Sequence, residues 1–152
     1  MKNKKWQSAK TVGNETESIV KTWLIELGYN FRQENTIANT RIRCKGSVDF
    51  TSDTFAIEVK RFTKLLTFKI GSEIHDLKWS QIEILNKACM NGKTAAILIT
   101  EDNVEFYFIN ISTLLLWICN NSRKSINSTI AKEIGYIIKD KEDLKRVLEG
   151  KA

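Results

Sequence analysis

Residues 45–50 read KGSVDF and residues 56–61 read AIEVKR, and these two stretches decide which fold the sequence predicts. Alternate residues of a strand lie on one face, so Glu58 and Lys60 share a face while Ile57 and Val59 point to the core. A turn around residues 52–54 would pair the two strands and bring Asp49 close to Glu58. Two carboxylates and one ammonium group are therefore expected together at one edge of a mostly apolar sheet.

Such a group of charges is costly in an apolar setting unless something neutralises it. Mg²⁺ prefers oxygen ligands and commonly binds one or two carboxylates while keeping several waters. A neighbouring lysine supplies positive charge where a scissile phosphate or an attacking hydroxide is negative. The pattern thus fits metal-assisted phosphodiester hydrolysis. The alternative is a solvated strand face of alternating charge, which produces the same three residues by chance.

The rest of the chain predicts a mixed α/β layer structure with helices on both faces of one sheet. Residues 94–100 form a continuous apolar run, which is typical of a strand buried on both faces. The first helix is expected from Asn14 to Gly28, a good N-cap and a good C-cap. Further strands are expected at 29–37, 47–51, 54–62, 104–111 and 136–139, and further helices at 74–91, 112–119, 129–135 and 140–149.

Composition indicates a globular domain with a polyanionic partner. The chain has 152 residues, a net charge of +6 and a hydrophobic share of 42%. A basic balance of this kind favours nucleic acid, although many soluble proteins are mildly basic. Residues 1–12 carry four lysines and no acid, which predicts a flexible basic arm.

Several classes are excluded. One histidine and three widely spaced cysteines leave no ligands for a Cys/His finger, a HExxH protease or a disulfide framework. No apolar run approaches the ~20 residues that a membrane span needs. No signal peptide is recognisable, so we expect a reducing cytoplasmic setting.

The residues above resemble a known family. Segments 46–50 (GSVDF) and 57–60 (IEVK) resemble the PD-(D/E)XK nuclease motif, with Val48 where the motif has proline. Segment 45–50 is also similar to the KGTVDF segment of RecU-type Holliday-junction resolvases. Weaker similarity extends over roughly residues 13–138, through segments 66–70 (LTFKI), 80–85 (SQIEIL), 124–126 (KSI) and 135–136 (GY).

The resemblance implies a restriction-endonuclease-like three-layer fold and a set of site residues. Asp49 and Glu58 would be metal ligands and Lys60 the catalytic lysine. Glu17 falls on the family's GxxxE glutamate and would contribute a metal or water ligand, whereas a capping box from Asn14 to Glu17 is the alternative by spacing. Gln81 matches a glutamine that faces the active site. The basic residues near the motif would contact phosphates without reading bases: Arg41, Arg43, Lys45, Arg61, Lys64, Lys69 and Lys78.

The implied activity is that of a Mg²⁺-dependent endodeoxyribonuclease, with Mn²⁺ as a possible substitute, formed by residues 13–152 as one nuclease domain. A Holliday-junction resolvase acting in recombination and repair is expected, with four-way DNA junctions as substrate and a homodimer as assembly. Such a protein would act in the bacterial nucleoid or be encoded by a phage or mobile element. RecU-type resolvases carry a long stalk before KGTVDF, whereas only residues 34–44 are available here, a layout similar to archaeal and phage resolvases. The alternatives are a restriction-like or repair-nicking endonuclease of the same superfamily, and a basic DNA-binding module without catalysis.

Overall fold

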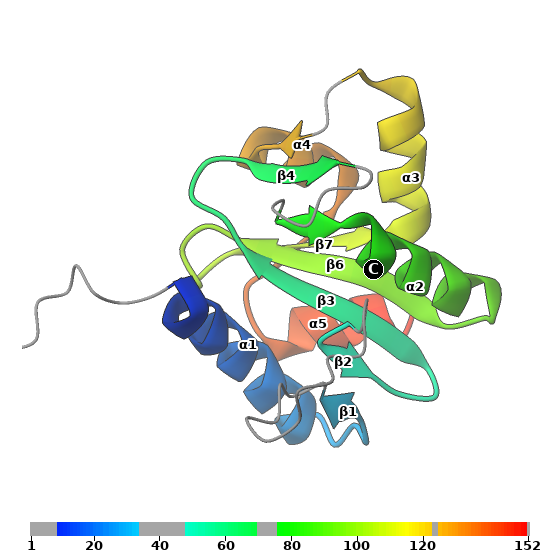
Figure 1. Cartoon of the computed structure of the whole chain (residues 1–152). Helices are drawn as coiled ribbons and strands as arrows, with labels where there is room; N and C mark the ends of the chain where they lie inside the picture. Colours follow the sequence, from blue (N-terminus) through cyan, green and yellow to red (C-terminus); the bar gives the residue numbers. More distant parts are fainter. Residues whose placement is uncertain (1–8, 34–47, 70–75, 123–124, 152) are drawn as a thin grey trace, which may run out of the picture.

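A mixed six-stranded sheet forms the centre of the molecule (Figure 1), with strand order β1-β2-β3-β6-β7-β9. The structure is a computed structural model that describes residues 9–33, 48–69, 76–122 and 125–151. Strands β3 and β6 pair in parallel, with Glu58 beside Ile97, and the other neighbours are antiparallel. The strands are β1 (Arg32–Gln33), β2 (Phe50–Thr51), β3 (Phe55–Arg61), β6 (Thr94–Thr100), β7 (Phe106–Asn110) and β9 (Tyr136–Ile138).

Helices cover both faces of this sheet and complete three layers (Figure 1). Helices α1 (Ala9–Glu26) and α5 (Lys141–Leu148) pack on one face, and α2 (Trp79–Met90) and α3 (Ile111–Asn120) pack on the other. Helix α4 (Ser128–Ile134) contacts β7. Two apolar clusters fill the spaces between the layers, one around Leu24 and Phe50, the other around Ile97 and Leu85. The predicted arrangement of helices on both faces of one sheet is confirmed.

The most strongly apolar strand is the one that the sequence indicates most clearly. Strand β6 has the predicted bounds, and Ala95 to Thr100 are all buried between the two helical layers. Helix α2 ends as predicted at a glycine, because Gly92 adopts a φ of 86° that disfavours other residues. No helix in the described ranges is both long and apolar enough to cross a membrane.

Several predicted boundaries are wrong. Helix α1 begins at Ala9, not at Asn14, so the backbone is already helical at the predicted N-cap. Residues 9–12 of the predicted arm are therefore helical. Helix α2 begins at Trp79 instead of residue 74, and Leu77–Lys78 form strand β5. Of the predicted strands at 29–37 and 47–51, the structure contains the short strands β1 and β2. Residues 34–47, which belong to one of the predicted strands or join the two, lie outside the described part.

A second, three-stranded sheet was not predicted at all. Strand β4 (Leu66–Lys69) lies between β5 (Leu77–Lys78) and β8 (Ser125–Ile126). The carboxylate Oδ2 of Asp76 accepts hydrogen bonds from the backbone N–H and the hydroxyl of Thr67, at 3.0 and 2.9 Å. Because β4 follows β3 directly, this small sheet is joined to the end of the strand that carries Lys60.

Candidate nuclease site

The β2–β3 hairpin brings two carboxylates into contact. Its turn is held by Ser52, whose Oγ accepts hydrogen bonds from the N–H groups of Thr54 and Phe55. Phe50 then lies opposite Ile57, which places Asp49 opposite Glu58. The Asp49 N–H donates to Oε1 of Glu58 at 3.2 Å, and the Val59 N–H donates to Oδ2 of Asp49 at 2.8 Å. Each carboxylate thus has one oxygen fixed by a backbone N–H of the other strand.

Glu58 is the most unusual group of the site, because its side chain is only 1% exposed. Its Oε2 lies 3.6 Å from Nζ of Lys60 and accepts no hydrogen bond from any residue that the structure describes. Burial, followed by the charge of Asp49, raises the pKa of Glu58 well above its usual range, and Lys60 opposes the shift. The prediction of an edge position is wrong, since β3 is an interior strand between β2 and β6.

Glu17 approaches the pair from helix α1. Burial raises its pKa from 4.5 to about 7, and the charge of Asp49 and a side-chain hydrogen bond with Asp49 add to the shift. The charge of Lys60 acts in the opposite direction. The capping-box alternative for Glu17 fails, because Asn14 lies inside α1 and cannot be its N-cap. The structure therefore brings together four of the predicted residues, Glu17, Asp49, Glu58 and Lys60.

The carboxylate pair fits a small hard cation. Within the described residues, no three His, Cys, Asp or Glu side chains already form a metal-binding group. Two carboxylates are nevertheless enough for Mg²⁺, which usually keeps several waters. A buried carboxylate oxygen without a hydrogen-bond donor is a costly arrangement that a cation would relieve. Asp49 and Glu58 are thus the residues that could hold a metal, with Glu17 beside them.

The side chain of Gln81 forms a hydrogen bond that stabilises the start of helix α2. It lies in the first turn of α2, where its Oε1 accepts a hydrogen bond from the Lys78 N–H at 3.1 Å. This bond satisfies one of the N–H groups that a helix start leaves without a partner. The predicted role of Gln81 in orienting groups near the metal or phosphate stays a prediction.

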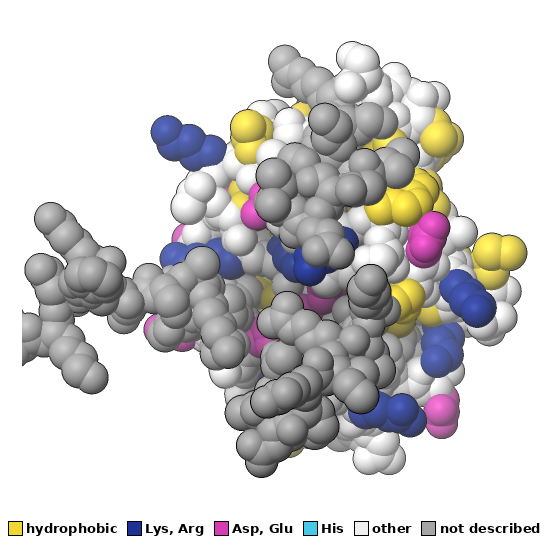
Figure 2. Space-filling view, in the orientation of Figure 1, with side chains coloured by type: hydrophobic (Ala, Val, Ile, Leu, Met, Phe, Trp, Pro, Cys, Tyr) yellow, Lys and Arg dark blue, Asp and Glu magenta, His cyan; other side chains and the backbone are white. Residues whose placement is uncertain are grey.

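The predicted phosphate contacts are described only in part. Arg61 and Lys64 are exposed at and after the end of β3, and Lys78 is half-buried in β5. Figure 2 shows basic and acidic side chains next to one another near the centre of one face. Arg41, Arg43 and Lys45 lie outside the described residues, as does the side chain of Lys69. Their contacts with DNA stay predictions.

A turn next to this site makes two contacts that sequence reasoning missed. The β6–β7 turn, residues 101–105, joins β6 to β7 next to the end of β3. Arg61 donates from Nε to the Glu101 carbonyl oxygen at 3.3 Å, and the Thr16 hydroxyl donates to Oδ1 of Asn103 at 2.6 Å. Thr16 and Asn103 are 87 residues apart, so no local pattern could have indicated their contact.

Comparison with known proteins supports the fold. No protein-family model and no curated protein matches the chain. The structure is similar to that of Hjc, a Holliday junction resolvase from the archaeal hyperthermophile Archaeoglobus fulgidus, with a TM-score of 0.53 and 18% sequence identity. The match covers 81% of this chain and 93% of Hjc. The predicted three-layer fold is therefore confirmed: the chain has an α/β fold similar to that of Hjc, with a mixed sheet between two layers of helices.

Proposed function

We propose that this protein is a Mg²⁺-dependent, structure-selective DNA endonuclease that resolves Holliday junctions. The observation that carries the proposal is the contact between Asp49 and Glu58 in the β2–β3 hairpin. The buried Oε2 of Glu58 lies 3.6 Å from Nζ of Lys60 and has no hydrogen-bond partner among the described groups. This arrangement lies in a fold similar to that of an archaeal Holliday junction resolvase. The net charge of +6 suits a polyanionic substrate.

Asp49 and Glu58 would hold the metal through the carboxylate oxygens that are not fixed by backbone N–H groups. When bound there, Mg²⁺ would lower the pKa of water and offset the negative charge of a phosphate. Glu17 lies close enough to Asp49 to share a proton with it, so it could hold or release that proton as the metal binds. Since metal ligands must be deprotonated, metal binding is expected to strengthen as the pH rises.

Lys60 would act on the phosphate and the attacking water. Its Nζ lies 3.6 Å from Oε2 of Glu58, and its side chain is 24% exposed, so it reaches the site without being sealed from solvent. A fixed ammonium group stabilises the negative charge that develops on a phosphate during hydrolysis. Arg61, Lys64 and Lys78 would add phosphate contacts that position the DNA and are sensitive to salt.

A junction is resolved by two paired nicks, which a two-fold homodimer would place symmetrically. Leu114 of helix α3 is fully buried in the core and cannot contribute to such an interface. Leu116 of the same helix is 63% exposed and stays available for such a contact. Dimerisation itself is part of the proposal.

The test is a cleavage assay with a labelled four-way junction, the matching linear duplex and the matching single strands. Wild-type protein is incubated with each DNA in Mg²⁺, in Mn²⁺ and in EDTA, beside the variant Lys60→Ala. We expect symmetric nicks in the junction, with either metal, that disappear in EDTA and with Lys60→Ala. Strand ends mapped on a denaturing gel report the symmetry.

Two other results would replace the proposal. Metal-dependent cleavage of the duplex at a fixed sequence would indicate a restriction-like enzyme. Tight junction binding that survives Lys60→Ala, with no cleavage in any metal, would indicate a DNA-binding module in which the charged hairpin has no catalytic role.

A further inference from the structure

We propose that the β6–β7 turn is a positioning element that holds helix α1, through the Thr16–Asn103 hydrogen bond, so that Glu17 faces the carboxylate pair. The proposal rests on the nuclease function above. It assigns a role to Thr16 and Asn103, which touch neither metal nor DNA in this account. Three features of the turn suit it to this role: its rigidity, its two attachments and its place beside Lys60.

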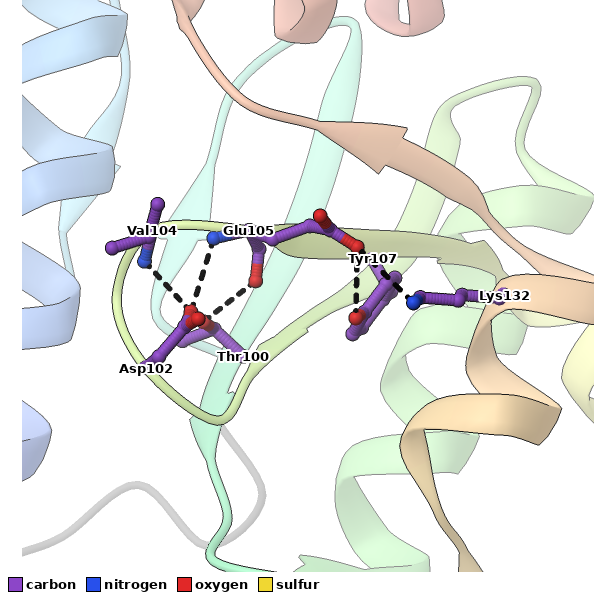
Figure 3. Close-up of polar contacts among 6 residues, drawn as sticks. All are labelled: Thr100, Asp102, Val104, Glu105, Tyr107 and Lys132. Atoms are coloured by element: carbon purple, nitrogen blue, oxygen red, sulfur yellow. Dashed lines mark hydrogen bonds and ion pairs between the residues drawn. The ribbon is translucent and has the colours of Figure 1, made fainter.

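The turn is rigid because its polar groups are paired with one another (Figure 3). Oδ1 of Asp102 accepts hydrogen bonds from the N–H groups of Val104 and Glu105, at 2.9 and 3.1 Å. The buried Thr100 hydroxyl donates to the Glu105 carbonyl at 2.8 Å and accepts from the Asn103 N–H at 3.0 Å. Asn103 has a φ of 63°, a left-handed conformation that asparagine tolerates better than most residues. Its side chain is therefore presented in a fixed direction.

The turn is attached to both elements that carry predicted catalytic groups. On one side, Arg61 Nε donates to the Glu101 carbonyl, and Arg61 directly follows Lys60. The Phe62 N–H also donates to the Thr100 carbonyl at 3.0 Å. On the other side, Thr16 donates to Asn103, and Thr16 directly precedes Glu17. The turn thus connects the neighbours of Lys60 and Glu17.

The contact with Thr16 is suited to set the position of a helix. Thr16 is 1% exposed, and its 2.6 Å hydrogen bond joins segments that no strand ladder connects. A hydroxyl bonded to a fixed amide oxygen limits both the rotation of α1 about its axis and its sliding along the sheet. Small displacements of a catalytic carboxylate are costly, since misplacement by about 1 Å can reduce a rate about 100-fold.

The test compares the same substitution, threonine to valine, at two positions of helix α1, Thr16 and Thr22. Thr16→Val removes the hydroxyl that bonds Asn103, and Thr16→Ser keeps it. Thr22→Val is the matched control, because the exposed Thr22 hydroxyl donates to the Ser18 carbonyl oxygen within the same helix. Asn103→Gly removes the acceptor and still accommodates the positive φ, which guards against misfolding of Thr16→Val. Junction cleavage is measured under steady-state conditions, which give kcat and KM, with urea unfolding as a check that each variant is folded.

We expect kcat to fall ~10-fold for Thr16→Val and Asn103→Gly, within the range seen when partners of metal ligands are removed. The KM for the junction should not change, because neither residue contacts DNA. Thr16→Ser and Thr22→Val should cleave like the wild type. Backbone amide hydrogen exchange at Glu17 to Val20 should be faster in the first two variants than in Thr22→Val.

Unchanged kcat in folded Thr16→Val and Asn103→Gly would overturn the inference, and so would an equal loss in Thr22→Val. The exchange measurement separates this failure from failure of the proposed function. If the wild type cleaves no junction, the proposed function fails. Faster exchange at Glu17 to Val20 would then still support the hold on α1, and unchanged exchange would overturn it.

Discussion

The Asp49–Glu58 pair of the β2–β3 hairpin and the β6–β7 turn are two polar clusters in which the carboxylates have opposite environments. In the turn, Asp102 accepts hydrogen bonds from two backbone N–H groups, and these bonds hold its pKa below the usual 3.8. In the β2–β3 hairpin, burial raises the pKa of Glu58, and its Oε2 has no hydrogen-bond donor among the described residues.

This difference distinguishes a carboxylate that stabilises the fold from one that is suited to a functional site. Hydrogen bonds to a carboxylate favour its charged form and stabilise the fold, as in the turn. Burial without such bonds opposes the charged form, and groups of this kind cluster at functional sites. The turn therefore contributes stability. The buried Oε2 of Glu58, in contrast, lacks a hydrogen-bond donor among the described residues that would stabilise its negative charge, and a bound cation could supply that stabilisation.

The largest effect is expected when the carboxylate pair is broken. Asp49→Asn should reduce metal-dependent junction cleavage by at least ~100-fold, because it removes a proposed metal ligand and the charge that faces the phosphate site. Asp53→Asn is the control, since Asp53 is exposed in the turn of the same hairpin. Single-turnover rates of the two variants decide the point. Equal rates would show that the pair is not the reaction centre.

The next effect is on stability without metal. The pKa of Glu17 is about 7 in the folded protein and near its ordinary 4.5 when unfolded, and that of Glu58 is raised as well. The folded state therefore binds more protons between these values, and the free energy of unfolding should fall as the pH rises from 4.5 to about 7. The loss should be on the order of 1 to 2 kcal/mol after allowing for solvent screening. Urea unfolding in EDTA across this range measures it, and a stability that rises with pH there would contradict the raised pKa values.

A smaller effect on the free energy of unfolding is expected next to the β6–β7 turn, where the carboxylates are hydrogen-bonded. Tyr107 donates its hydroxyl to Oε1 of Glu105 at 3.0 Å (Figure 3). Burial, followed by this hydrogen bond, raises the pKa of Tyr107 to about 12. Tyr107→Phe removes this bond and should reduce the free energy of unfolding by about 1 kcal/mol. Cleavage should not change, because no described contact links Tyr107 to the carboxylate pair. Thermal or urea unfolding, together with the junction assay, tests both statements.

The smallest effect is expected from the ion pair at the same glutamate. Nζ of Lys132 lies 3.7 Å from Oε1 of Glu105, and both side chains are partly exposed. Exposed pairs contribute little, so Lys132→Ala should change the free energy of unfolding by less than about 0.5 kcal/mol. A loss as large as that of Tyr107→Phe would mean that the ion pair, and not the hydroxyl bond, stabilises this cluster.

The parts of the fold that the sequence predicted are those with strong local patterns. Strand β6 is a seven-residue apolar run, and β3 alternates between two kinds of side chain. The small sheet was missed because β5 and β8 have two residues each, too few for a period to show. The start of α1 was missed because Asn14 resembles an N-cap, whereas the helix runs through Asn14 from Ala9.

The site was predictable where it depends on the hairpin and not where it depends on tertiary packing. Strand alternation and the turn at Ser52 predicted that Asp49 meets Glu58, which the structure confirms. Alternation specifies the face of a side chain but not its depth, so the complete burial of Glu58 could not be predicted. The Thr16–Asn103 bond joins two distant segments and has no signature in either.

The most direct test of this contrast is the stability of Glu58→Gln at pH 8 in EDTA. An amide can still accept the Asp49 N–H and carries no charge that burial opposes. We predict that the variant is more stable than the wild type, by on the order of 1 kcal/mol, and that it no longer cleaves junctions. A less stable variant would contradict this prediction, because the buried carboxylate of Glu58 would then stabilise the fold as that of Asp102 does.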